Sequence, residues 1–228
     1  MLGANGSGKS TLLKLLSGLL YAEEGTVKFL GQSLDEESLS NEEFSFAFRR
    51  RVGFVFQNSD AQLFNSNVWE EIAFGPVQLG LDSEQVRGRV ESMLHLLEIE
   101  HLRNRPPFKL SGGERKKVAL ASVLSVNPEV LLLDEPTMAL DPRTQGWLVE
   151  MLIELNRTGK TIITATHDLA IVPVIADKMF VFNEEHRVVA EGEPVELLAD
   201  YDLLASVNLI DRTFHEHRHP KYAHLHAH

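Results

Sequence analysis

The sequence predicts an α/β fold in which helices cover a mostly parallel sheet. Short apolar strands alternate with helical segments, and the strand in VLLLDEP is apolar throughout, as expected of a strand buried on both faces. A chain of 228 residues with 43% hydrophobic residues can also bury one sizeable core. We therefore expect one domain over residues 1–211, with a helical subdomain at about residues 58–110 inserted in its core.

Each element has its own signal in the sequence. The first helix follows MLGANGSGKS, where leucines recur at helical spacing. A helix from Gly80 to about Leu97 has Asp82 or Ser83 as its N-cap and an apolar face behind it. LDEESLSNEEF reads as a surface connection with about one helical turn. The strands are expected in EEGTVKFLG, RVGFVFQ, NPEVLLLDEP, KTIITATHD, KMFVF and HRVVAEG, with a crossover helix before KTIITATHD and a last helix in PVELLAD.

Composition narrows the class of protein. The chain has no cysteine, which excludes a disulfide framework, and no unbroken apolar run of the about 18 residues that cross a bilayer as a helix. The N-terminus has no signal-peptide pattern, so we expect a soluble protein of the cytoplasm. A formal net charge of -11 argues against nucleic acid as a partner, because phosphate backbones attract basic faces.

The first ten residues contain a phosphate-binding loop. The spacing G-x-x-x-x-G-K-[ST] lets glycine backbone amides surround a triphosphate, while the lysine reaches its outer phosphates and the serine can ligate magnesium. Because a helix follows, its N-terminal dipole also favours an anion. The alternative is a glycine-rich turn that merely caps a helix. The candidate phosphate-binding residues are Gly3, Asn5, Gly6, Ser7, Gly8, Lys9, Ser10 and Thr11.

A pair of acidic residues ends the apolar strand of VLLLDEP. Ligands of open α/β sheets bind at the carboxyl ends of the strands, where Asp134 and Glu135 would lie. Asp134 would hold magnesium through water, and Glu135 would act as the general base that polarises the attacking water. The alternative is that two acids simply close a strand.

The stretch KLSGGERKKVALA predicts a second anion-binding helix end. Ser111 and Glu114 form a capping box, which by itself indicates only a well-defined helix start. A cap does not need the pair Gly112 and Gly113, however, and these glycines expose amides at the helix N-terminus. Two phosphate-binding helix ends in one chain suggest a nucleotide that is shared between two chains.

Taken together, the motifs resemble those of the ATP-binding cassette (ABC) ATPases. The phosphate loop, Gln57 after a strand, LSGGE, LLLDEP, ALD ending at Asp141 and THD with His167 occur in that family's order and span nearly the whole chain. The resemblance implies a phosphate-loop ATPase core with a helical subdomain, ATP and Mg2+ as cofactors, and a head-to-tail dimer. In such a dimer ATP lies between the phosphate loop of one subunit and the LSGGE signature of the other.

The resemblance also implies roles for single residues. The magnesium ligands are Ser10, Gln57 and Asp134, and Glu135 is the catalytic base. His167 is similar to the histidine that contacts the γ-phosphate and keeps water and base aligned; without the other motifs it would read as a surface histidine at a strand end. Ser111, Gly112 and Gly113 bind nucleotide from the partner chain, and Asp141 meets the partner's phosphate loop.

The stretch VGFVFQNSDAQLFNSNVWEEIAFGPVQLGL is similar to the segment after the glutamine in ATPases of energy-coupling factor importers, which bring in cobalt, nickel and B-type vitamins. In that group the segment contacts a transmembrane subunit, so the resemblance implies a peripheral place on the cytoplasmic face of the membrane. The large apolar residues in it can instead fill the core of the helical subdomain, which we expect for about half of them. They are Leu63, Phe64, Val68, Trp69 and Phe74.

The C-terminal residues 212–228 are rich in histidine and are expected to form a disordered tail. Neutral imidazoles suit nickel, cobalt, copper and zinc, so the tail could bind such a metal and favours cobalt or nickel as the transported substrate. A tail without a role is the alternative. The candidate ligands are His215, His217, His219, His224, His226 and His228.

The beginning of the chain departs from the resemblance. Related cassettes have two or three strands before the phosphate loop, whereas Met1 and Leu2 alone precede it here, so we expect an N-terminally truncated cassette. Neighbouring strands would then keep unpaired backbone groups, each costing about 1–3 kcal/mol if buried. Two other functions stay open: a soluble ABC ATPase that serves no transporter, and a nucleotide-binding remnant that does not hydrolyse ATP.

Overall fold

The computed structural model describes residues 1–211 of the 228-residue chain. The histidine-rich tail and its six candidate metal ligands lie outside the described residues. The chain divides into two compact units: Thr11–Thr164 forms one, and Met1–Ser10 together with the chain from Ala165 onward forms the other. The predicted single domain over residues 1–211 with an inserted subdomain stays a prediction.

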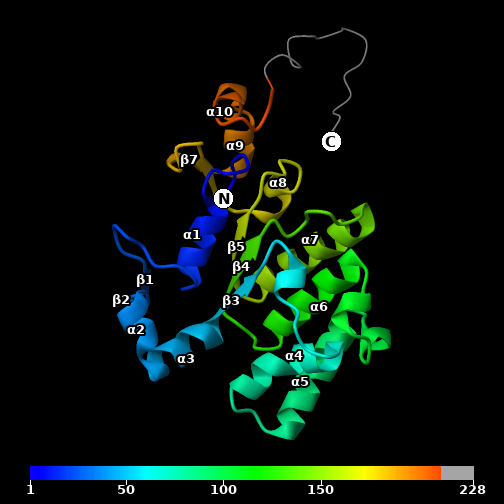
Figure 1. Cartoon of the computed structure of the whole chain (residues 1–228). Coiled ribbons are helices and arrows are strands. Elements are labelled where there is room, and N and C mark those ends of the chain that lie inside the picture. Colours follow the sequence, from blue (N-terminus) through cyan, green and yellow to red (C-terminus); the bar gives the residue numbers. More distant parts are fainter. Residues whose placement is uncertain (212–228) are drawn as a thin grey trace. The chain divides into compact units, whose positions relative to one another are not determined.

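The larger unit contains a sheet in the order β3-β4-β5 (Figure 1). Strand β3 (Val52–Val55) pairs in parallel with β4 (Val130–Asp134), and the register runs from Val52 opposite Val130 to Val55 opposite Leu133. The third strand is β5 (Thr161–Ala165). Residues 131–134 of β4 are buried, which confirms the prediction of a central apolar strand.

Helices account for most of the rest of this unit. Helix α5 begins after Asp82, whose carboxylate accepts the Gln85 N–H, so of the two predicted N-cap candidates Asp82 is the cap and Ser83 is the first helical residue. Helix α4 packs against both α5 and α6, and Figure 1 shows the three as neighbours. The helices are α4 (Val68–Gln78), α5 (Ser83–Leu96), α6 (Gly112–Leu124) and the crossover helix α7 (Pro142–Arg157), with short 3-10 turns at Ser59–Ala61, Glu100–Leu102 and Pro107–Lys109.

The acidic connection before β3 is more helical than expected. It contains two helices, α2 (Glu36–Ser40) and α3 (Glu42–Arg51), because Asp35 and Asn41 each cap a new helix start. A small antiparallel pair, β1 (Lys28–Phe29) and β2 (Gln32–Ser33), precedes them. The Phe29 ring packs edge-on against Phe48 at 5.1 Å between ring centroids, so an apolar contact fixes α3.

The smaller unit is built on an antiparallel pair, β6 (Met179–Phe182) and β7 (Val188–Gly192). Three short helices accompany it, namely α8 (Val172–Ile175), α9 (Pro194–Leu198) and α10 (Tyr201–Ser206). Pro194 opens α9, as predicted. The core of the unit consists of Leu2, Val172, Met179, Val181, Leu204 and Val207.

Met1 and Leu2 take the place of a strand in this unit. The Leu2 N–H donates to the Phe180 carbonyl at 2.8 Å, and the Phe182 N–H donates to the Leu2 carbonyl at 2.8 Å. On the other side, the Thr166 N–H donates to the Met1 carbonyl at 3.0 Å. The expectation of unpaired backbone groups on the neighbouring strands is therefore wrong at these three positions. Met1 and Leu2 are therefore enough to pair with the neighbouring segments directly before the phosphate loop.

Truncating Leu2 to alanine is expected to destabilise the protein by about 2–5 kcal/mol, because its fully buried side chain would leave a cavity in this core. Urea unfolding followed by circular dichroism measures the loss. Leu19→Ala is the matched control, since Leu19 is 52% exposed and should cost less than about 0.5 kcal/mol. Equal effects of the two substitutions would contradict a structural role for Leu2.

Among residues 1–211, every helix is too short or too polar to cross a membrane.

Candidate functional site

The phosphate loop is a tight turn with two glycines at positive φ. Gly6 and Gly8 have φ angles of 85° and 90°, in the left-handed region that favours glycine. Helix α1 (Lys9–Leu16) then begins at the lysine of the motif. The first glycine lies in close contact with β6, because a Cβ on Gly3 would lie 2.9 Å from the Phe182 carbonyl oxygen. The loop is therefore a tight turn that leads into a helix N-terminus.

Lys9 is folded back into the loop. Its side chain is almost fully buried, and its ammonium nitrogen Nζ donates to the carbonyl oxygens of Gly3 at 2.8 Å and Ala4 at 3.0 Å. Ser7 is also buried, whereas Asn5 and Gly6 are exposed at the tip of the loop. Ser10 and Thr11 follow in the first turn of α1. A buried cation beside exposed loop backbone suits an anionic ligand.

His167 belongs to the same compact unit as the loop. It follows Thr166, which forms a parallel bridge with Leu2, the residue before Gly3. The imidazole is exposed, and Asp168 turns the chain away by accepting the Ala170 N–H at 2.9 Å. The ends of two neighbouring extended segments thus carry the loop and the predicted γ-phosphate contact.

Asp134 and Glu135 lie at the carboxyl end of β4 in the other unit. Both are buried, with 5% of each residue exposed. Glu135 has a φ of 42°, which is uncommon for a residue with a side chain, and its carbonyl accepts the Met138 N–H at 3.2 Å. Backbone strain of this kind concentrates at functional sites, where the surrounding structure holds a side chain in place.

Gln57 lies at the same edge of the sheet as these acids. Strands β3 and β4 are parallel and in register, so the residues that follow Val55 and Leu133 emerge side by side. The Gln57 amide Nε2 donates to the Met138 sulfur at 3.0 Å. The structure therefore brings Gln57 to the chain segment that continues from Asp134 and Glu135.

The signature segment forms the predicted capping box at the start of α6. The Ser111 hydroxyl accepts the Glu114 N–H at 3.3 Å, and the Ser111 N–H donates to the Glu114 carboxylate at 2.7 Å. This backbone hydrogen bond lowers the pKa of Glu114. Gly112 is exposed, and a Cβ there would meet nothing within 4 Å, so this helix end is open to solvent on the side of Gly112.

Asp141 has a structural role that the sequence motif did not predict. Its carboxylate caps α7 by accepting the Arg143 and Thr144 N–H groups at 3.0 and 3.1 Å and the Thr144 hydroxyl at 2.6 Å. The hydrogen bond from the Thr144 hydroxyl is the main cause that lowers the pKa of Asp141. Thr144 also lies 3.4 Å from the position of a Cβ on Gly113, which connects the ALD segment to the signature helix.

Sequence reasoning missed Lys116, a buried lysine on the signature helix. Its Nζ donates to the backbone carbonyls of Phe56 at 3.2 Å and Gln57 at 3.4 Å. Burial lowers the pKa of Lys116 to about 8, while the charge of Asp134 acts in the opposite direction. Its place within the signature, in the run ERKK, looks like an ordinary solvated helix face. Only the pairing of α6 with the chain after β3 shows that it is buried.

Two neighbours of Lys116 strengthen this connection. The Arg115 guanidinium forms an ion pair with Asp60 at 2.7 Å. The Gln62 amide donates to the Ala119 carbonyl at 2.9 Å, and its oxygen accepts the Phe56 N–H at 3.2 Å. The side chains of Arg115 and Gln62 therefore add to the contact that Lys116 makes between helix α6 and the segment around Gln57.

The low pKa of Lys116 predicts a specific dependence of stability on pH. Lys116 keeps its proton up to about pH 10.5 in the unfolded chain but releases it near pH 8 in the folded protein. Because the unfolded state binds more protons between these values, the free energy of unfolding increases as the pH rises from about 8 to 10.5. We expect the unfolding free energy of the wild type, relative to Lys116→Met, to increase by up to about 3 kcal/mol from pH 7.5 to 10.5. Urea titrations without nucleotide or magnesium measure it. If the difference in unfolding free energy between the wild type and Lys116→Met does not change with pH, the lowered pKa of Lys116 is wrong.

The predicted apolar segment after Gln57 divides between core and surface. Val68 is fully buried, whereas Phe64 and Phe74 are 67% and 43% exposed and pack edge-on with ring centroids 5.0 Å apart. The buried Glu71 carboxylate fixes the loop below them by accepting the N–H groups of Phe64 at 2.9 Å and Asn65 at 2.7 Å. Leu63 and Trp69 are partly buried. A small aromatic surface is thus held on a rigid base.

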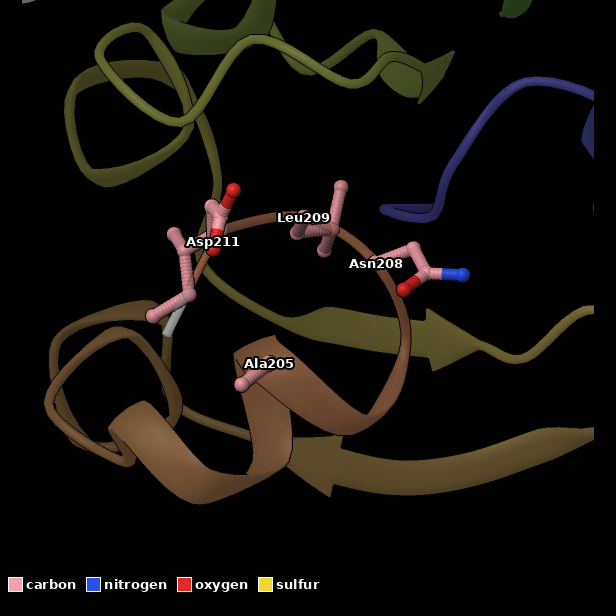
Figure 2. Close-up of a pocket in the computed structure, with 5 residues that line it drawn as sticks. Ala205, Asn208, Leu209 and Asp211 are labelled. Carbon is pink, nitrogen blue, oxygen red and sulfur yellow. The ribbon is translucent and has the colours of Figure 1, made fainter. Parts of the chain in front are cut away.

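A separate hollow of about 530 Å³ lies near the end of the described chain (Figure 2). Its lining residues, Ala205, Asn208, Leu209, Ile210 and Asp211, include none of the predicted site residues. Within residues 1–211 no group of three or more histidine, cysteine, aspartate or glutamate side chains is arranged to hold a metal ion.

The predicted site residues therefore fall into two groups. Gly3 to Ser10 and His167 belong to the smaller unit, and Thr11, Gln57, Asp134, Glu135, the signature and Asp141 belong to the larger one. Ser10 in the smaller unit and Gln57 and Asp134 in the larger one each offer an oxygen donor of the hard kind that Mg2+ prefers.

A loop of positive-φ glycines that leads into a helix, and two acids that close a buried parallel strand, define a phosphate-loop nucleoside triphosphatase. The sequence profile of the family described as ABC transporter matches residues 1–138. The chain belongs to the ABC transporter family, and it is an ATP-binding subunit with ATPase activity.

Individual relatives make the comparison more specific. The nickel import ATP-binding protein NikO of Rhodobacter capsulatus is 48% identical over 92% of this chain and 84% of its own. An energy-coupling factor transporter ATP-binding protein, EcfA, of Methanococcus maripaludis is 40% identical over 99% of this chain and 76% of its own. The solved structure of cbiO1 from Clostridium perfringens, part of the ABC transporter complex cbiONQ, has a TM-score of 0.75 and 38% identity, covering 94% of this chain and 84% of that one.

Proposed function

We propose that this chain powers an importer of the energy-coupling factor type by hydrolysing ATP with Mg2+ between two subunits arranged head to tail. The observation that carries the proposal is the open signature helix. Gly112 is exposed and a Cβ there would meet nothing within 4 Å, while the phosphate loop belongs to a different compact unit of the chain. A second subunit would bring its signature to this phosphate loop and complete the binding of the triphosphate.

Each predicted residue has a defined task in this proposal. The loop amides and Lys9 hold the β- and γ-phosphates, and Ser10, Gln57 and Asp134 would hold Mg2+, which neutralises charge on the phosphates when bound. The Glu135 carboxylate accepts a hydrogen bond from the attacking water and polarises it, and His167 contacts the γ-phosphate. Ser111, Gly112 and Gly113 act on the ATP of the partner, with Asp141 at the same interface.

The aromatic surface of Phe64 and Phe74 supports a transmembrane subunit as the partner. Two exposed rings on a base that Glu71 fixes are a rigid apolar contact, of the kind that anchors protein interfaces. The segment is similar to the one that meets the transmembrane subunit in energy-coupling factor ATPases. The chain would then sit on the cytoplasmic face of the membrane, with either a second copy or a sister ATPase as its dimer partner.

Nickel or cobalt is the proposed substrate of the importer. The 48% identity to a nickel import ATPase, the structural similarity to cbiO1 and the histidine-rich stretch after residue 211 support this choice over a vitamin. Calorimetric titration of Ni2+ and Co2+ into the full chain and into a chain that ends at Asp211 tests the tail. Equal heats in both would remove the support that the tail gives.

Uptake in cells tests the whole proposal. Deleting the gene is expected to abolish accumulation of radiolabelled nickel or cobalt, and the wild-type gene should restore it. Phe64→Glu should lower both uptake and the amount of protein in the membrane fraction, whereas Phe46→Glu, at an exposed ring outside this segment, should change neither. Normal metal uptake in the deletion strain would refute a metal importer.

A further inference from the structure

The turn between β6 and β7 contains a residue in an unusual conformation. His186 has a φ of 62°, a region that glycine and asparagine enter more readily than other residues. Asn183 fixes the turn: its side-chain oxygen accepts the Arg187 N–H at 2.9 Å, and its backbone carbonyl accepts the His186 N–H at 3.2 Å. The turn therefore holds His186 in a conformation that costs free energy.

His186 is exposed to solvent, and one side of its side chain lies beside the phosphate loop. A Cβ on Gly8 would lie 3.4 Å from both the Cβ and the Nδ1 of His186, and 3.6 Å from its Cγ. These distances place the imidazole beside the glycine that precedes Lys9. Gly8 and His186 belong to the same compact unit, so the contact lies within one body.

The end of β6 supports the loop at its other end as well. A Cβ on Gly3 would lie 2.9 Å from the carbonyl oxygen of Phe182 and 3.1 Å from its Cβ. Phe182 and His186 thus contact the first and the last glycine of the motif from one hairpin. Lys9 joins the two ends from inside, since its Nζ donates to the Gly3 carbonyl.

We propose that His186 is a positioning residue for nucleotide binding. Its imidazole packs on Gly8 and holds the loop amides in the arrangement that receives the triphosphate; this deepens the proposed function and rests on it. A flexible glycine pays conformational entropy when it is fixed, and a ring packed against it lowers that cost before the ligand arrives. The strained turn is consistent with such a role, because backbone strain concentrates at functional sites.

The consequence is an effect on affinity rather than on chemistry. Removing the ring should raise the Kd for MgATP and the KM of hydrolysis together by about three- to tenfold, with kcat nearly unchanged. Stability should not fall, because glycine adopts the required φ without strain.

The test compares three variants of the full chain with the wild type. His186→Gly keeps the turn and removes the ring. His186→Asn keeps a residue that tolerates positive φ and has a Cβ, a Cγ and a planar amide in place of Nδ1, so it should retain affinity close to the wild type. Glu185→Ala changes an exposed neighbour in the same turn and serves as the control. Calorimetry gives Kd for MgATP and MgADP, and steady-state hydrolysis gives KM and kcat.

The expected result is weaker binding and a raised KM for His186→Gly alone. Unchanged Kd and KM in that variant, or a loss confined to kcat, would overturn the proposal. Lys9→Ala separates the two levels of inference. If Lys9→Ala loses MgATP while His186→Gly binds normally, only the role of His186 fails; if Lys9→Ala also binds normally, the proposed nucleotide site itself is wrong.

Discussion

Replacing Glu135 by glutamine is expected to lower the rate of ATP hydrolysis by at least about a hundredfold while leaving MgATP binding intact. The substitution keeps the size and hydrogen-bonding reach of the side chain and removes its ability to polarise the attacking water. Glu135 is buried and held at a positive φ next to Asp134, so the variant should keep the same geometry. Phosphate release under saturating MgATP measures the rate.

The same variant should also reveal the dimer. If ATP lies between two subunits, a chain that binds but does not hydrolyse it accumulates as a dimer, which size-exclusion chromatography with light scattering detects. Glu150→Gln, on the crossover helix α7, provides a carboxylate control of the same chemistry away from β4. Hydrolysis at the wild-type rate by Glu135→Gln would show that another group is the base.

Lys9→Ala is expected to abolish measurable MgATP binding at concentrations that saturate the wild type. Two effects act in the same direction. The variant loses the cation that would pair with the outer phosphates, and it leaves the carbonyls of Gly3 and Ala4 without the donor that Lys9 Nζ provides at 2.8 and 3.0 Å. The Ala4 carbonyl still accepts the Ser7 N–H at 3.2 Å, whereas the Gly3 carbonyl loses the Lys9 donor; a buried acceptor without a partner costs about 1–3 kcal/mol, so the loop conformation should also weaken.

Calorimetric titration of MgATP checks this result. Lys14→Ala is the matched control, because Lys14 lies in the last turn of the same helix and should leave the affinity unchanged. Thermal unfolding without nucleotide separates the two effects: a lower melting temperature reports the loss of loop contacts, and an unchanged one assigns the effect to the phosphate contact. MgATP affinity equal to that of the wild type would exclude the loop as the nucleotide site.

Several parts of the fold and site follow directly from local sequence. The glycine spacing of residues 3–8 predicts a phosphate-binding loop, and Gly6 and Gly8 have the positive φ angles that glycine adopts without strain. The capping residues Asp82 and Ser111 start their helices as predicted. The apolar run before Asp134 predicts a buried strand that ends in acids. These features depend on neighbours within a few residues, so the chain itself encodes them.

Other parts required the tertiary structure. Met1 and Leu2 are too short to read as a strand, and only their pairing with Thr166, Phe180 and Phe182 shows that they complete a ladder. The acidic connection contains two helices, α2 and α3, each started by its own cap. The packing of α3, however, depends on the contact between Phe48 and Phe29, which lies in β1, outside both helices. Such contacts join residues that local periodicity cannot relate.

The sequence by itself determined the class of this protein: the order and spacing of its motifs specify a phosphate-loop ATPase of the ABC transporter family, because phosphate and magnesium chemistry demands fixed residue types at fixed local positions. Only the tertiary structure decided which side chains support that chemistry. Lys116 is buried against the Gln57 segment, and His186 packs on Gly8. Both lie in stretches that look solvated, and the sequence does not show that the fold buries Lys116 or that it brings the exposed His186 next to Gly8.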